Sequence, residues 1–178
     1  MTKTIRLKWP KGVVGKLVPL YGGTYYFADT LEKFNQMFDY LTGVPGASGD
    51  DTDCLGCAMA LENPKDGGAL YLIGVFDGGY GVLAHEVGHL TTYVLERAGV
   101  PMDVHTTEAF CYLLGYLFED IQPLLDKSNL ERVEAELESE VVEGKPVDQK
   151  KAALVSALKP SMGAYNAAKG KGVRRGRS

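Results

Sequence analysis

The pentapeptide His85-Glu86-Val87-Gly88-His89 constrains this chain more than any other feature. In a helix with 3.6 residues per turn, positions 85 and 89 lie on one face, one turn apart. Two imidazoles placed in this way bind one Zn²⁺, and Glu86 is suited to activate the zinc-bound water as general base. All three histidines of the chain lie between positions 85 and 105, so the pattern indicates a metal-bearing helix rather than chance.

A catalytic zinc usually has three protein ligands and one open position. Glu108 is the leading candidate for the third ligand, since it lies 19 residues after His89 in the first turn of the next predicted helix. A break at Gly99 and Pro101 would let the chain double back. His105 competes as third ligand or as hydrogen-bond donor to an oxyanion on the substrate. Three tyrosines are further oxyanion candidates: Tyr93, Tyr112 and Tyr116.

The spacing of apolar residues predicts both strands and helices. Strands are expected at residues 4–9, 13–20, 23–28, 56–62 and 69–76. Helices are expected at residues 29–42, 80–98, 106–126, 128–143 and 147–158. This order predicts an α+β fold in which a small mixed sheet packs on the HExxH helix and on the following glutamate-bearing helix.

Local signals set the expected ends of these helices. Asp29 followed by Glu32 three residues later reads as a capping box, and Gly43 ends that helix. Gly88 and Gly115 lack side chains at positions where the metal helix and the next helix would meet. We therefore expect the two helices to approach closely there.

The charge distribution predicts three regions along the chain. All 23 acidic residues precede residue 160, whereas five of the 19 basic residues follow it. We expect a catalytic-type domain at 1–126, an acidic helical extension at 127–160 and a basic, disordered tail from about 159, with 161–178 as the tail proper. An acidic body is a poor surface for nucleic acid, so only the tail is a candidate for such contacts.

Cysteine usage and hydropathy bear on the compartment. Three cysteines, an odd number, argue against a disulfide framework and favour a reducing cytoplasm. No apolar run reaches the roughly 18 residues of a membrane span, and the N-terminus lacks a signal-peptide core. The motif Cys54-x-x-Cys57 has no second CxxC in the chain and is interpreted as structural. Asp50, Asp51 and Asp53 lack the spacing of an EF-hand and are also interpreted as structural. Cys111 is expected in the core.

The residues His85, Glu86, His89 and Glu108 resemble the gluzincin type of HExxH zincin metallopeptidase. The sequence motif HEVGHL…TEAFCYLL also resembles those of the small ImmA/IrrE-type and phage-encoded metallopeptidases. The resemblance covers residues 69–122, and Tyr112 stands where larger gluzincins place a supporting acid. It implies that the strand before the metal helix, 69–76, forms the cleft edge to which substrate adds as another strand.

The resemblance implies a zinc-dependent peptidase that cleaves a peptide or protein substrate in the cytoplasm, or in the host cytoplasm if the protein is phage-encoded. Zn²⁺ is the expected cofactor, and no membrane partner is expected. The alternative is a non-catalytic zincin-fold binding or phage assembly protein with a structural or vestigial metal. A third hypothesis assigns partner docking to the acidic helix 128–143. The oligomeric state is left open.

Overall fold

The computed structural model describes residues 8–13, 15–47, 53–143, 146, 148–157 and 159. Contacts divide the chain into two compact units, Met1–Leu125 and Asp126–Ser178. Most of the predicted strand at 4–9 and the whole tail at 161–178 lie outside the described residues. Lys8 and Trp9, the described end of that predicted strand, are not in a strand.

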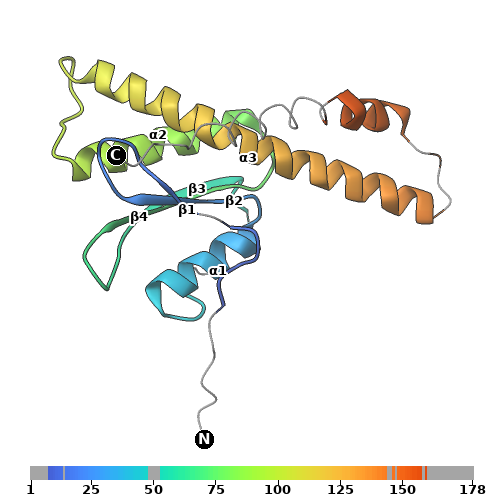
Figure 1. The fold of residues 1–178 in the computed structure, drawn as a ribbon, viewed down its shortest axis with the longest axis horizontal. Coiled ribbons are helices and arrows are strands. Elements are labelled where there is room, and N and C mark those ends of the chain that lie inside the picture. Colours follow the sequence, from blue (N-terminus) through green and yellow to red (C-terminus); the bar gives the residue numbers. More distant parts are fainter. Residues whose placement is uncertain are drawn as a thin grey trace, which may run out of the picture. The chain divides into compact units, whose positions relative to one another are not determined.

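The first unit contains a four-stranded mixed sheet, so the expected α+β class is confirmed. Its strands are β1 (Gly15–Leu17), β2 (Thr24–Ala28), β3 (Gly56–Glu62) and β4 (Ala69–Val75). They lie in the order β1-β2-β4-β3, as Figure 1 shows. β2 and β4 run parallel, and the two outer pairs are antiparallel.

The sheet order corrects one expectation about the cleft. The segment 69–76 was expected at the sheet edge, but β4 is paired on both sides and the edge strand beside it is β3. The reason is the crossover between β2 and β4, which places β2 against β4 in parallel and leaves β3 outermost. The strand expected at 13–20 is also shorter, because Pro19 and Leu20 form a turn in which Leu20 has φ 66°.

Helix α1 (Leu31–Thr42) lies between β2 and β3 in the chain, and its N-cap is one residue later than expected. Its N-cap is Thr30, whose Oγ1 accepts from the Lys33 amide at 3.2 Å. Asp29 instead forms an ion pair with the Lys33 ammonium at 2.7 Å, so the predicted Asp29 cap is wrong. The predicted end at Gly43 is confirmed, with φ 73° at that residue.

Two long helices follow the sheet. α2 (Tyr80–Arg97) matches the expected 80–98 within a residue, and Gly99 stops it with φ 70°. α3 (Thr107–Val142) is one continuous helix, so the predicted division into 106–126 and 128–143 is wrong. Pro123 lies inside it, and residues 126–128 contain no glycine or proline that would end it.

The core of the first unit has two parts, one on each face of the sheet. Phe34 and Met37 of α1 pack with Leu72 and Ala28 on one face. On the other face, α2 and the first half of α3 pack against the sheet (Figure 1). The buried residues that α2 contributes include Leu83, Val87, Leu90 and Val94, and those of α3 are Leu113, Leu117, Ile121 and Leu125.

The second unit is helical where it is described, and residues 149–157 form a helix close to the predicted 147–158. The Lys151 ammonium forms ion pairs with Glu136 at 2.7 Å and Glu140 at 3.3 Å. Lys159, where disorder was expected to begin, is helical and pairs with Glu134 at 2.6 Å. Across the described residues, no helix is both long and apolar enough to span a bilayer.

Candidate metal centre

The two histidines of the pentapeptide face each other on the surface of α2. Their Nε2 atoms lie 3.1 Å apart, and their ring planes meet at 80°. Two nitrogens that bind one tetrahedral zinc at 2.0–2.1 Å are separated by about 3.3 Å. His85 and His89 are both exposed, so the pair presents two aligned imidazole nitrogens to solvent at nearly the separation that a shared metal requires.

Glu86 lies between α2 and the edge strand β3 and is only 6% exposed. Its Cγ would lie 2.9 Å from a Cβ added to Gly56, so the missing side chain of Gly56 makes room for it. Among the described residues no group is hydrogen-bonded to its carboxylate, and none of their side-chain polar atoms is both fully buried and unpaired. The carboxylate therefore reaches solvent through a narrow opening.

Burial raises the pKa of the Glu86 carboxyl above its ordinary value, and the imidazoles of His85 and His89 partly offset that rise. A carboxylate in an apolar setting holds a proton more readily than one in water. This environment suits a group that must accept a proton and release it again.

The histidines lie on the flank of α2 that faces away from its buried stripe. Leu83, Val87 and Leu90 belong to the core cluster that also contains residues of α3. At 100° per residue, the midpoint of His85 and His89 lies roughly 150° round the helix from that stripe. The flank that carries the two histidines is therefore turned away from the helix that was expected to complete the site.

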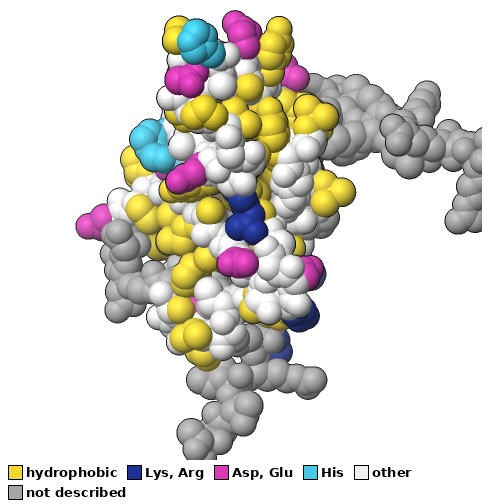
Figure 2. All heavy atoms as spheres, turned by 90° about the vertical axis from the view of Figure 1, so that its left-hand side faces the viewer, with side chains coloured by type: hydrophobic (Ala, Val, Ile, Leu, Met, Phe, Trp, Pro, Cys, Tyr) yellow, Lys and Arg dark blue, Asp and Glu magenta, His cyan; other side chains and the backbone are white. Residues whose placement is uncertain are grey.

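Neither candidate third ligand joins the pair in this structure. Among the described residues, no group of three or more His, Cys, Asp and Glu side chains is placed to hold a metal ion. α2 continues for eight residues, about 12 Å, beyond His89 before the chain turns, so Glu108 and His105 lie at its far end. Figure 2 shows histidine side chains at two separated places on the surface.

One of the three candidate tyrosines lies beside the pair. Tyr93, one turn after His89, stacks on its ring at a centroid distance of 6.2 Å and an interplanar angle of 20°. Tyr112 is 76% exposed and lines a different groove, together with Tyr116 and Cys111. Cys111 is exposed, so its expected place in the core is wrong; it lies on the side of α3 opposite to the buried Leu113 and Leu117 stripe.

The other motifs singled out in the sequence add no metal ligands. Cys54 and Cys57 are half-buried thiols that form no disulfide, and neither joins a metal-binding cluster within the part of the chain that the structure describes. Asp50 and Asp51 lie outside the described residues, and Asp53 is exposed. Gly88 and Gly115 do not mark a close helix contact, because a Cβ added to either would meet nothing within 4 Å.

The edge position of β3 is the feature that the sequence reasoning missed. Phe76 donates to the Leu55 carbonyl and Asn63 donates to the Gly68 carbonyl, both at 2.8 Å, so the odd-numbered residues of β3 bond to β4. In an antiparallel pair the alternate residues then turn their backbone groups outward. Those residues are Gly56, Ala58, Ala60 and Glu62, and no local pattern in the sequence marks their strand as the edge.

No protein-family model matches the chain, and neither the curated proteins nor the solved structures contain a match to it. What this site does is therefore inferred from the chain's own residues and their geometry.

Proposed function

We propose that this protein is a zinc-dependent metallopeptidase with a zincin-like arrangement, in which His85 and His89 bind the metal and Glu86 is the general base. The observation that carries the proposal is the 3.1 Å separation of the two exposed Nε2 atoms beside a nearly buried carboxylate. The nitrogens are the donors that zinc prefers, and their spacing fits one tetrahedral ion.

Each residue has a separate task in this proposal. Bound zinc supplies Lewis-acid chemistry that polarises the carbonyl of the scissile amide. Glu86 accepts a proton from the attacking water and later transfers it to the leaving amine. Tyr93, stacked on His89, fixes the orientation of that imidazole. The protein thereby orients both the metal and the base before substrate arrives.

The open edge of β3 favours an extended peptide as substrate. The outward backbone groups of Gly56, Ala58 and Ala60 offer donors and acceptors to another strand, and nothing in the described chain pairs with them. Gly56 packs directly against Glu86, so a peptide added to this edge passes beside the base. The substrate class is therefore a peptide or protein loop that can adopt a strand.

A third zinc ligand remains part of the proposal. Glu108 is its candidate, and His105 is the competitor; either would have to leave its present place at the end of α2. Zinc titration distinguishes them, because Glu108→Ala should weaken binding at least tenfold if Glu108 is a ligand, whereas His105→Ala should not. Equal affinities for the wild type and both variants would show that the metal is held without either.

The decisive experiment measures metal and turnover together. Zinc should co-purify at about one ion per chain and be lost in His85→Ala and His89→Ala. Glu86→Gln should retain zinc but abolish cleavage in a peptide library. Glu138→Gln, an exposed carboxylate on α3, is the matched control and should behave as the wild type. A metal-free protein in zinc-containing medium, or full activity in Glu86→Gln, would refute the proposal.

One observation favours a second candidate, a non-catalytic binding or phage assembly protein with a structural or vestigial metal. The absence of a three-ligand cluster among the described residues is what a degenerate site would show. This candidate predicts bound zinc without turnover of any peptide and an unchanged phenotype for Glu86→Gln.

A further inference from the structure

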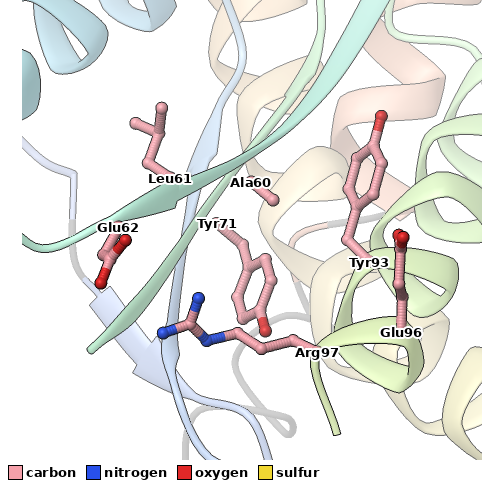
Figure 3. A pocket seen from close by; sticks show the side chains of 7 residues that line it. All are labelled: Ala60, Leu61, Glu62, Tyr71, Tyr93, Glu96 and Arg97. Atoms are coloured by element: carbon pink, nitrogen blue, oxygen red, sulfur yellow. The ribbon is translucent and has the colours of Figure 1, made fainter. Parts of the chain in front are cut away.

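A cavity of about 360 Å³ opens between the end of β3, the neighbouring β4 and the last turns of α2. Figure 3 shows the Tyr71 side chain extending from β4, with the Arg97 side chain crossing next to its hydroxyl group. Tyr93 and Glu96 project from α2 on the opposite side, and Glu62 lies beyond the Arg97 guanidinium. Two tyrosines and three charged side chains thus line one cavity.

The cavity shares one side chain with the candidate metal centre. Tyr93 lines the cavity and also stacks on His89, so one side chain belongs to both. Ala60, whose backbone faces the open edge of β3, lines the cavity from the strand side. A peptide added to that edge therefore carries its side chains from the histidines toward the cavity.

The distance along α2 between His89 and the cavity residues indicates which substrate residue would reach the cavity. Tyr93 and Arg97 lie four and eight residues after His89, which is roughly 6–12 Å along α2. An extended peptide advances about 3.3 Å per residue. The cavity therefore receives the side chain of a residue two to four positions from the scissile bond.

The charges in the cavity are unequal. Arg97 donates to the Gly67 carbonyl at 2.6 Å, which ties its guanidinium to the β3–β4 turn. Within the described chain, Glu62 and Glu96 are exposed carboxylates that form no ion pair. The two carboxylates outnumber the one guanidinium, which is held by its hydrogen bond to Gly67. The cavity therefore carries a net negative charge.

We propose that this cavity is a specificity pocket for a basic side chain, lysine or arginine, of an extended peptide bound along β3. The aliphatic stem lies against the Tyr93 ring, and the Glu62 and Glu96 carboxylates at the two sides of the cavity attract the cationic head. The proposal rests on the proposed function only for the path of the peptide. Binding of a basic peptide to the cavity is independent of zinc and of cleavage.

The test measures peptide binding to the full-length, metal-free Glu86→Gln protein by fluorescence anisotropy. The probes are fluorescein-labelled, alanine-rich nonapeptides that carry one lysine, one glutamate or one leucine at a scanned position. The lysine peptide should bind more tightly than the other two at one position, and the preference should weaken as salt is raised. Equal affinity of the three peptides at every position would overturn the proposal.

Charge variants locate the binding. Glu62→Gln and Glu96→Gln should each lower the binding affinity for the lysine peptide by about two- to fivefold, as expected for exposed charge pairs. Arg97→Gln should raise the affinity for the lysine peptide, while the control Glu138→Gln should leave that affinity unchanged. If none of the three cavity variants changes the preference for lysine, the peptide binds elsewhere and the proposal is wrong.

Turnover separates the two proposals. A lysine preference in binding without cleavage by the wild-type protein supports the pocket and counts against the peptidase. Cleavage with no preference for a basic residue at any position supports the peptidase and overturns the pocket.

Discussion

Gly56→Ala should destabilise the first unit, because this glycine is where the edge strand β3 contacts helix α2. An added Cβ would lie 2.5 Å from Val82 Cγ1, 2.9 Å from Glu86 Cγ and 2.9 Å from the Gly74 carbonyl oxygen. The two side chains of α2 can rotate away. The carbonyl belongs to β4, which is paired on both sides and cannot move without breaking the sheet.

The magnitude follows from two opposing effects. Overpacking of this kind costs about 1–3 kcal/mol. Replacing a strand glycine by alanine gains about 0.5–1 kcal/mol from the lower entropy of the unfolded chain. The free energy of unfolding should therefore fall by about 0.5–2 kcal/mol, which lowers Tm by roughly 2–6 °C in a chain of this size.

Urea unfolding followed by circular dichroism measures the change, with an unchanged m-value expected. The control is Gly88→Ala in α2, where an added Cβ meets nothing within 4 Å. That variant should be more stable than the wild type by up to about 1 kcal/mol, since alanine is the better helix former. If Gly56→Ala proves as stable as Gly88→Ala, the contact between β3 and α2 is looser than described and the reasoning fails.

Three further predictions concern the rest of the fold. Asp120→Ala should lower the free energy of unfolding by about 1–3 kcal/mol, because the buried Tyr25 hydroxyl and the Lys16 ammonium both donate to this carboxylate; urea unfolding checks it. Burial raises the pKa of Tyr71 above its ordinary value of 10.0, with Arg97 partly offsetting the rise. The folded state thus holds that proton more tightly. The resulting stability is fully present below about pH 10 and is lost as the pH rises through the raised pKa, so Tyr71→Phe should lessen the loss of stability above about pH 10. Pro123→Ala should restore a helical hydrogen bond in α3 and raise the helix stability by about 1–3 kcal/mol, measured by thermal unfolding.

Elements with strong local signals were predictable from the sequence. Gly43 and Gly99 end α1 and α2 as expected, because each adopts a left-handed conformation that other residues resist. The strands at 56–62 and 69–76 also match closely, since alternating or continuous apolar residues are bounded by glycine and proline turns. These features depend on neighbours in the chain, which the sequence displays directly.

Features set by distant contacts were not predictable. The capping pattern fits both Asp29 and Thr30, and the choice depends on the ion pair of Asp29 with Lys33. The edge position of β3 depends on β2 inserting beside β4, which no local pattern encodes. Spacing to Glu108 likewise gives its distance along the chain but not the path between α2 and α3, which leaves Glu108 at the end of α2 rather than beside His89.

The flank on which the histidines lie restricts how any third ligand can arrive. Glu96 shares that flank but lies seven residues, about 10 Å, beyond His89, whereas a zinc ligand must be within about 2 Å of the metal. Moving Glu108 to the pair would release Phe110 and Leu113 from the core, at about 1.5–3 kcal/mol for each side chain. Every 1.4 kcal/mol reduces affinity tenfold, so zinc bound through Glu108 would be roughly a hundredfold or more weaker than zinc in a preformed site. A tight zinc complex therefore argues for a ligand that reaches the open flank beside β3, where a substrate strand would also lie.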